Sequence, residues 1–224
     1  MDVVTATGIL KDARKAVEAG SGLGGTGFWK LVGEIKRDPD LSRFIDDVAE
    51  IDQKAFKNWA LLWVPLWLGT TIMLVATAAG LLFVSLAYPA DGFMAAVWLL
   101  LGTGVLLATT HGLGHLLVGR MVGIEFTGWF IGKVTQPQPG VKTDHASYLR
   151  TDPAKRAWMH ASGALVTKAI PLLMIGSGIA AEAPSWSVWL LLVLGLAMIT
   201  TDVLWSTKAS DWKKFQREMS FVQS

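Results

Sequence analysis

Residues 93–118 read FMAAVWLLLGTGVLLATTHGLGHLLV. The run contains no Asp, Glu, Lys or Arg. It is longer than the roughly 20 residues that an α-helix needs to cross a hydrocarbon core about 30 Å thick. The stretch therefore predicts a membrane-spanning helix.

Three further apolar runs have the length of a membrane span: Trp59–Tyr88, Trp158–Ala181 and Trp186–Trp205. The connections Pro89–Gly92 and Glu182–Ser185 join the first span to the second and the third to the fourth. Both connections are too short to be domains. The sequence thus predicts an all-α integral membrane protein with four transmembrane helices in the lipid bilayer.

Composition agrees with a membrane protein and excludes several other classes. Of the 224 residues, 52% are apolar and 17% are charged, whereas a soluble domain carries about 25% charge. A net charge of +2 gives no basic face for DNA or RNA, so we expect no nucleic-acid partner. The chain has no cysteine, which excludes disulfides, thiolate metal ligands and catalytic thiols.

The distribution of Lys and Arg predicts the orientation. Nine of the 20 precede the first span, six lie in the loop 119–157, four follow Trp205, and Lys168 lies within a span. The two short connections have none. Because cytoplasmic loops are enriched in Lys and Arg, both termini and the long loop are predicted to be cytoplasmic.

The predicted organisation has two parts: a cytoplasmic helical segment, 1–58, and a membrane domain, 59–224. The first part is expected to contain two helices around the glycine-rich stretch Gly20–Gly25. That stretch matches the letters of a dinucleotide-binding motif but follows no strand, so we interpret it as a connector. Apolar residues from Leu41 to Phe56 recur at helical spacing after Asp38-Pro39-Asp40, which predicts an amphipathic helix.

Two histidines in the second span are the most informative residues. His111 and His115 are four apart, so on a helix their rings leave the same face one turn apart. That spacing suits a metal ion held by two nitrogens. Imidazoles this deep in a membrane are costly without a partner, which makes them functional candidates. Interhelical hydrogen bonding and ligation of haem or another pigment remain open alternatives.

The run HGLGHLLVGRMVGIEF, residues 111–126, resembles the HExxH region of the site-2 protease family of intramembrane zinc metalloproteases. Residues 160–167 occupy the place of that family's second motif, and Ser210-Asp211-Trp212 resembles the motif whose aspartate is the third zinc ligand. The interval Ile124–Val134 resembles the family's membrane-edge strand. The resemblance covers about residues 93–220. It implies a zinc site of His111, His115 and Asp211 and a strand-like insert in the loop 119–157. It also implies a partner-binding groove, to which we assign Ser162, Gly163, Thr167, Lys168 and Asp202.

The sequence departs from the family pattern at three motif positions, one of which is that of the catalytic base. Gly112 stands where the zinc proteases have the glutamate that acts as general base, and a glycine cannot accept a proton. Thr167 replaces an asparagine and Trp212 a glycine. No carboxylate lies one turn away, and Glu125 is interpreted as a strand residue. The resemblance with these changes implies a catalytically inactive relative, a pseudoprotease.

Two more ionisable residues are predicted to lie within the spans. Lys168 falls ten residues after Trp158, near the middle of the bilayer. We expect it to pair with Asp202, or else to occupy a small wet cavity. Asp202 also competes with Asp211 for the role of third metal ligand.

Three functions follow from these observations. The leading one is a site-2-protease-like pseudoprotease that binds a transmembrane partner or serves as a subunit of a membrane complex. The second is an active intramembrane zinc protease with an unusual base. The third is a membrane subunit in which His111 or His115 ligates haem or a chlorophyll-type pigment. Zinc is the expected cofactor, with a tetrapyrrole as the alternative.

Overall fold

The computed structural model describes residues 1–132, 139–204 and 210–222. In this part of the chain four helices are long and apolar enough to cross a membrane, as the sequence predicts. They are α4 (Leu66–Leu86), α5 (Gly92–Met121), α7 (Pro153–Ala180) and α8 (Ser185–Leu204). The predicted end of the fourth span, Trp205, lies outside the described residues. The chain is therefore a mainly helical protein with four candidate membrane spans.

The start of the first span differs from the prediction. Residues Leu62–Pro65, assigned from the sequence to the helix, form the strand β1, and α4 begins only at Leu66. Trp63 and Val64 have the aromatic and β-branched side chains that suit a strand. Pro65 lacks an N–H group, and it stands at the end of an edge strand, where the lost hydrogen bond is tolerated. Hydropathy alone does not separate such a strand from the apolar helix that follows it.

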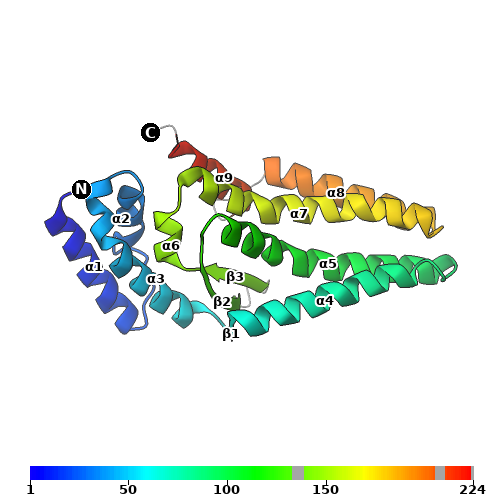
Figure 1. Cartoon of the computed structure of the whole chain (residues 1–224), viewed down its shortest axis with the longest axis horizontal. Coiled ribbons are helices and arrows are strands. Elements are labelled where there is room, and N and C mark those ends of the chain that lie inside the picture. The colour runs from blue at the N-terminus through cyan, green and yellow to red at the C-terminus, as the bar shows by residue number, and fades with distance from the viewer. Residues whose placement is uncertain (133–138, 205–209, 223–224) are drawn as a thin grey trace. The chain divides into compact units, whose positions relative to one another are not determined.

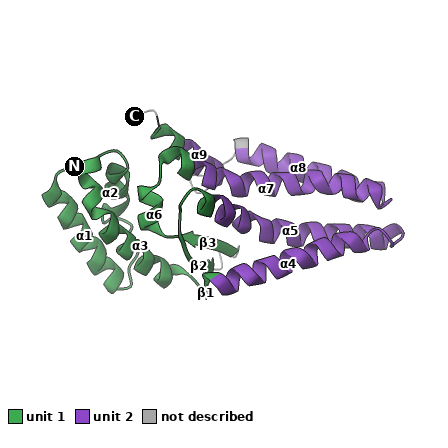
Figure 2. Ribbon diagram, viewed as in Figure 1, with its two compact units in different colours: residues 1–66, 119–156, 218–224 green, residues 67–118, 157–217 purple. Residues whose placement is uncertain are grey.

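The chain divides into two compact units, coloured separately in Figure 2. Unit 1 comprises residues 1–66, 119–156 and 218–224, and unit 2 comprises residues 67–118 and 157–217. The loop between the second and third spans thus clusters with the N-terminal segment, whereas the predicted organisation has a single boundary, between residues 58 and 59.

Unit 2 contains two helical hairpins, α4–α5 and α7–α8, which can be followed in Figure 1. A buried apolar cluster is formed by residues of α4, α5 and α8 and by the residues that directly follow α4 and α7: Val84, Ala87, Leu99, Leu106, Ala181 and Leu191. Ile170, Met174 and Ile175 of α7 pack against it. The helices α4 and α5 approach closely at Gly102, where an added Cβ would lie 2.7 Å from the Gly80 carbonyl oxygen. Nearby, the Thr77 hydroxyl donates a hydrogen bond to Thr109 Oγ1 (2.8 Å). Small residues and hydroxyl groups of this kind are typical of helix contacts in membranes.

Unit 1 has more helical elements than the two predicted. It contains α1 (Val3–Glu18), α2 (Phe28–Ile35), the 3-10 helix η1 (Pro39–Phe44) and α3 (Ile45–Trp59). The predicted amphipathic helix therefore begins at Ile45, and residues 41–44 belong to η1. The glycine-rich stretch is a connector, as predicted, and Gly20 and Gly25 adopt positive φ angles that suit glycine.

The strand-like insert predicted for the loop 119–157 is part of a three-stranded antiparallel sheet of order β1-β2-β3. Strand β2 is Phe126–Ile131 and β3 is Pro139–Thr143. Strand β2 falls within the predicted interval 124–134, whose residues 133 and 134 lie outside the described part. Glu125 is exposed and directly precedes β2 rather than lying within it. The short helix α6 (His145–Arg150) follows the sheet.

A buried charge cluster joins three elements of unit 1. Asp52 of α3 pairs with Lys142 of β3, and its Oδ2 lies 3.2 Å from Nδ1 of His145 at the start of α6. Burial raises the pKa of Asp52, but the hydrogen bond from His145 and the charge of Lys142 outweigh it and lower the pKa to about 2. His145 is thus a partly buried residue at the start of α6, held by its contact with Asp52.

Candidate metal centre

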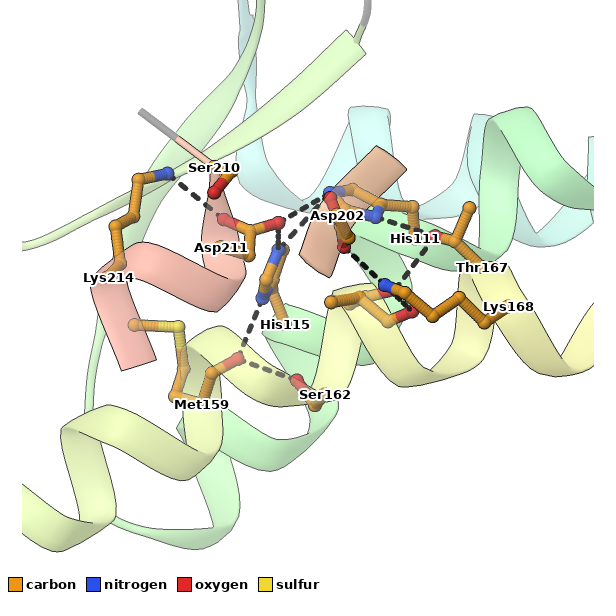
Figure 3. Close-up of polar contacts among 12 residues, drawn as sticks. His111, His115, Met159, Ser162, Thr167, Lys168, Asp202, Ser210, Asp211 and Lys214 are labelled. Carbon is orange, nitrogen blue, oxygen red and sulfur yellow. Dashed lines mark hydrogen bonds and ion pairs between the residues drawn. The ribbon is translucent and has the colours of Figure 1, made fainter. Parts of the chain in front are cut away.

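Three predicted ligands meet in unit 2 (Figure 3). Asp211 Oδ2 lies 3.2 Å from His111 Nε2 and 3.1 Å from His115 Nε2. The two Nε2 atoms are 3.3 Å apart, and all three ligand atoms lie within 4.8 Å of one another. The structure therefore joins Asp211, rather than Asp202, to the histidine pair.

The local fold explains how each ligand reaches the cluster. His111 and His115 lie one turn apart on α5, and their rings meet edge to face with centroids 4.7 Å apart. Asp211 is the first residue of α9 (Asp211–Ser220), and the hydroxyl of the preceding Ser210 accepts a hydrogen bond from the Lys213 amide. A serine at this position caps the helix and so places Asp211 in its first turn.

Hydrogen bonds orient both histidine rings. His115 Nδ1–H donates to the Met159 carbonyl oxygen (2.7 Å), which has no proton of its own. The Thr167 hydroxyl donates to the Gly163 carbonyl (2.8 Å), so its oxygen accepts from His111 Nδ1–H (2.8 Å). With Nδ1 protonated, each neutral imidazole directs its Nε2 lone pair toward the carboxylate of Asp211.

Two nitrogen lone pairs and a carboxylate oxygen therefore converge on one point. Such atoms repel one another unless a cation or a proton lies among them. Metal-bound histidines usually donate their other ring N–H to an oxygen acceptor, as both do here. The donor set is the nitrogen and oxygen type that binds zinc. These residues fit a divalent metal ion.

Glycine on α7 allows the close approach of His115. A Cβ added at Gly163 would lie 2.3 Å from His115 Nε2. Across the same contact, a Cβ at Gly114 would lie 3.3 Å from Val166 Cγ2 and 3.4 Å from the Ser162 carbonyl oxygen. Any side chain at Gly163 would occupy the space of the imidazole ring. Gly163, predicted as a groove residue, thus contacts the centre itself.

Ser162, predicted to line the same groove, is buried, and its hydroxyl donates to the Met159 carbonyl (2.7 Å). That carbonyl therefore accepts hydrogen bonds from both Ser162 and His115. Thr167, the third predicted groove residue, orients His111 instead. The second predicted motif thus supplies contacts to the histidines.

The charge of Asp211 is balanced on its other side. Lys214 Nζ lies 3.0 Å from Asp211 Oδ1, so the two carboxylate oxygens have different partners. Sequence reasoning missed Lys214, although its spacing of three residues after Asp211 in a helix is a usable signal. It also missed Met159, whose backbone carbonyl has no sequence signature.

Lys168 and Asp202 form an ion pair between α7 and α8, which confirms the predicted pairing. Lys168 Nζ also donates to the Ala164 carbonyl (3.1 Å). Asp202 is therefore engaged by Lys168.

Gly112 is buried beside His111 on α5. Among residues 1–132, 139–204 and 210–222, the one group of three or more side chains able to hold a metal ion contains a single carboxylate, that of Asp211. The centre thus has a ligand set, whereas position 112 brings no proton acceptor to it. Comparisons with family models, characterised proteins and solved structures find no match to this chain.

Proposed function

We propose that this chain is a membrane protein with an intramembrane His₂Asp zinc centre, similar to that of the site-2 proteases, and that it does not hydrolyse peptides. The observation that carries the proposal is the convergence of His111 Nε2, His115 Nε2 and Asp211 Oδ2. Three protein ligands on zinc leave a fourth position for water or another molecule. Bound zinc would lower the pKa of such a water toward about 7.

The lack of hydrolysis is inferred from position 112. General acid–base catalysis contributes about 10²- to 10⁴-fold, and Gly112 offers no group for it. Asp211 is turned toward the histidines and Lys214, and Asp202 is paired with Lys168. An active zinc protease, the second function considered, therefore has less support than a pseudoprotease.

A tetrapyrrole has less support than a metal ion. An axial ligand needs one open nitrogen facing a broad flat space. Both Nδ1 atoms are engaged with α7, and both Nε2 atoms face Asp211. A macrocycle would have to displace Asp211 from the cluster.

We further propose that both termini and the loop 119–157 are cytoplasmic, on the basis of the Lys and Arg distribution. The role we propose is to bind a transmembrane segment of a partner, or to act as a subunit of a membrane complex. The support for this role is a ligand centre between spans that lacks a general base. Such a partner would itself be a membrane protein.

The test is metal content together with cleavage. Elemental analysis of the purified wild-type protein should find about one zinc per chain, and His115→Ala should abolish it because two ligands are too few for a tetrahedral site. The matched control is His145→Ala, which removes an imidazole from unit 1. The wild type should leave transmembrane peptides uncut. Unchanged zinc in His115→Ala would refute the metal centre, zinc-dependent cleavage would refute the pseudoprotease, and visible absorption of a bound pigment would favour the tetrapyrrole.

A further inference from the structure

The C-terminal part of α9 is held by buried charges. Glu218 has no exposed surface, and its carboxylate pairs with Lys36 and with Arg156, whose Nε lies 2.8 Å from Oε2. Lys36 follows α2 directly, and Arg156 lies in the first turn of α7. The side chains of Lys36 and Arg156 are only 8% and 3% exposed. All three charges are therefore removed from water.

The stability of this cluster depends on the presence of all of its charges. Removing one partner of a buried ion pair leaves an uncompensated charge, which is strongly destabilising. Tyr148 adds to the cluster, because its ring lies 5.1 Å from Lys36 Nζ and 5.5 Å from the Arg156 guanidinium carbon. The residues around Glu218 are thus arranged to hold one carboxylate.

The helix that carries Glu218 also carries Asp211. Helix α9 has 10 residues, fewer than the about 12–15 that an isolated helix needs to be even marginally stable in water. Its order therefore depends on tertiary contacts. In its first half these include the contact of the Phe215 ring with that of Trp158 on α7, with centroids 5.6 Å apart, and the contacts of Asp211 with the histidines. In its second half they include the ion pairs of Glu218 with Lys36 and Arg156.

Asp211 and Glu218 are seven residues, or about two turns, apart. Helix formation is cooperative, so loss of order at Glu218 spreads toward the first turn. Asp211 depends on that turn, since the Ser210 cap and the contact with Lys214 three residues later both require helical geometry. A helix that frays would release the aspartate from the histidines.

We propose that Glu218 is a positioning residue for the metal centre: its ion pairs with Lys36 and Arg156 keep α9 helical, and the helix keeps Asp211 at the histidines. The inference rests on the proposed zinc-binding function. It gives the N-terminal segment a role in metal binding, through Lys36.

The first test is the Zn²⁺ affinity of the purified full chain, measured by competition with a chelator. Glu218→Gln should weaken Zn²⁺ binding about tenfold or more, because loss of the residues that orient metal ligands commonly has an effect of this size. Lys36→Met, which leaves the Arg156 pair in place, should act in the same direction, and Lys36→Arg should keep the wild-type affinity. The matched control is Glu125→Gln, which removes the same charge from an exposed position. Wild-type affinity in a folded Glu218→Gln or Lys36→Met protein would overturn the inference.

The second test does not depend on metal. Because the chain has no cysteine, a spin label at Gln216→Cys, an exposed position of α9, reports the order of this helix alone. The label should become more mobile in Glu218→Gln and not in Glu125→Gln. An immobile label in Glu218→Gln overturns the inference. If the wild type binds no Zn²⁺, the proposed function fails, and the label still decides whether Glu218 orders α9.

Discussion

At the scale of single residues, each histidine of the centre has one ring nitrogen bound to α7 and the other facing Asp211. The side chain of His115 is 13% exposed and that of His111 is 35% exposed. His115 is therefore the more enclosed of the two histidines, with Gly163 against its ring. The position of the His115 ring thus depends on Gly163, which has no side chain that could bind a metal ion.

We expect Gly163→Ala to weaken Zn²⁺ binding about tenfold or more. The added methyl group would lie 2.3 Å from His115 Nε2, so the imidazole must move away from Asp211 or α5 must move away from α7. The control is Gly176→Ala on the same helix, where an added Cβ has no neighbour within 4 Å. Equal zinc affinities in the two variants would show that His115 adjusts without cost.

A second prediction at this scale concerns the loss of folding stability at low pH. The pKa of Asp52 is lowered from 3.8 to about 2 in the folded protein, so this carboxylate stabilises the fold above about pH 4 and loses that contribution as the pH falls toward 2. The shift corresponds to about 2 kcal/mol. Denaturant titrations followed by circular dichroism should therefore show a smaller loss of stability between pH 5 and pH 2.5 in Asp52→Asn than in the wild type. Identical losses of stability in the two proteins would mean that Asp52 does not contribute to the acid sensitivity of the fold.

At the scale of elements, the hairpin α4–α5 brings two helices close enough for backbone contact. The position that permits this is Gly102, where a Cβ would lie 2.6 Å from Val84 Cγ2, 2.7 Å from the Gly80 carbonyl oxygen and 2.8 Å from the Val84 amide nitrogen. Two of these neighbours are backbone atoms, which cannot rotate away. Close contact of this kind between small residues is a main source of helix association in a bilayer.

Gly102→Ala should therefore destabilise the detergent-solubilised protein by about 1–3 kcal/mol, the usual cost of forcing an extra carbon into a packed contact. Gly104→Ala is the matched control, because it lies two residues away on α5 and an added Cβ there has no neighbour within 4 Å. The measurement is the unfolding midpoint of each variant. A Gly102→Ala protein as stable as Gly104→Ala would contradict the tight α4–α5 contact.

At the scale of the whole molecule, the topology can be tested by labelling. The absence of native cysteine makes single-cysteine variants clean reporters. If the two short connections are external, Asp91→Cys and Ala183→Cys should react with an impermeant reagent added outside intact cells. Thr143→Cys at the end of β3 should react only after the membrane is opened. Labelling of Thr143→Cys in intact cells would refute the proposed orientation.

Much of the architecture follows from local sequence. Four apolar runs predict the four long helices because spanning length and hydropathy are properties of consecutive residues. The spacing of His111 and His115 places both rings on one helix face for the same reason. The depth of Lys168 in its span predicts a charged partner, and the structure pairs it with Asp202. The resemblance in residues 210–212 led to Asp211, which the structure places at the histidines.

Other features depend on which distant segments pack together. The strand β1 was hidden in an apolar run, because its identity comes from pairing with β2, more than 60 residues later in the chain. The orientation of His115 by Met159, the space left by Gly163 and the burial of Glu218 between Lys36 and Arg156 are all contacts over long sequence separations. Sequence by itself determined the spans and the pairing of the two histidines, since both depend on residues that lie close together along the chain. Only the tertiary structure decided which aspartate joins them and what holds it there, since that depends on packing between helices.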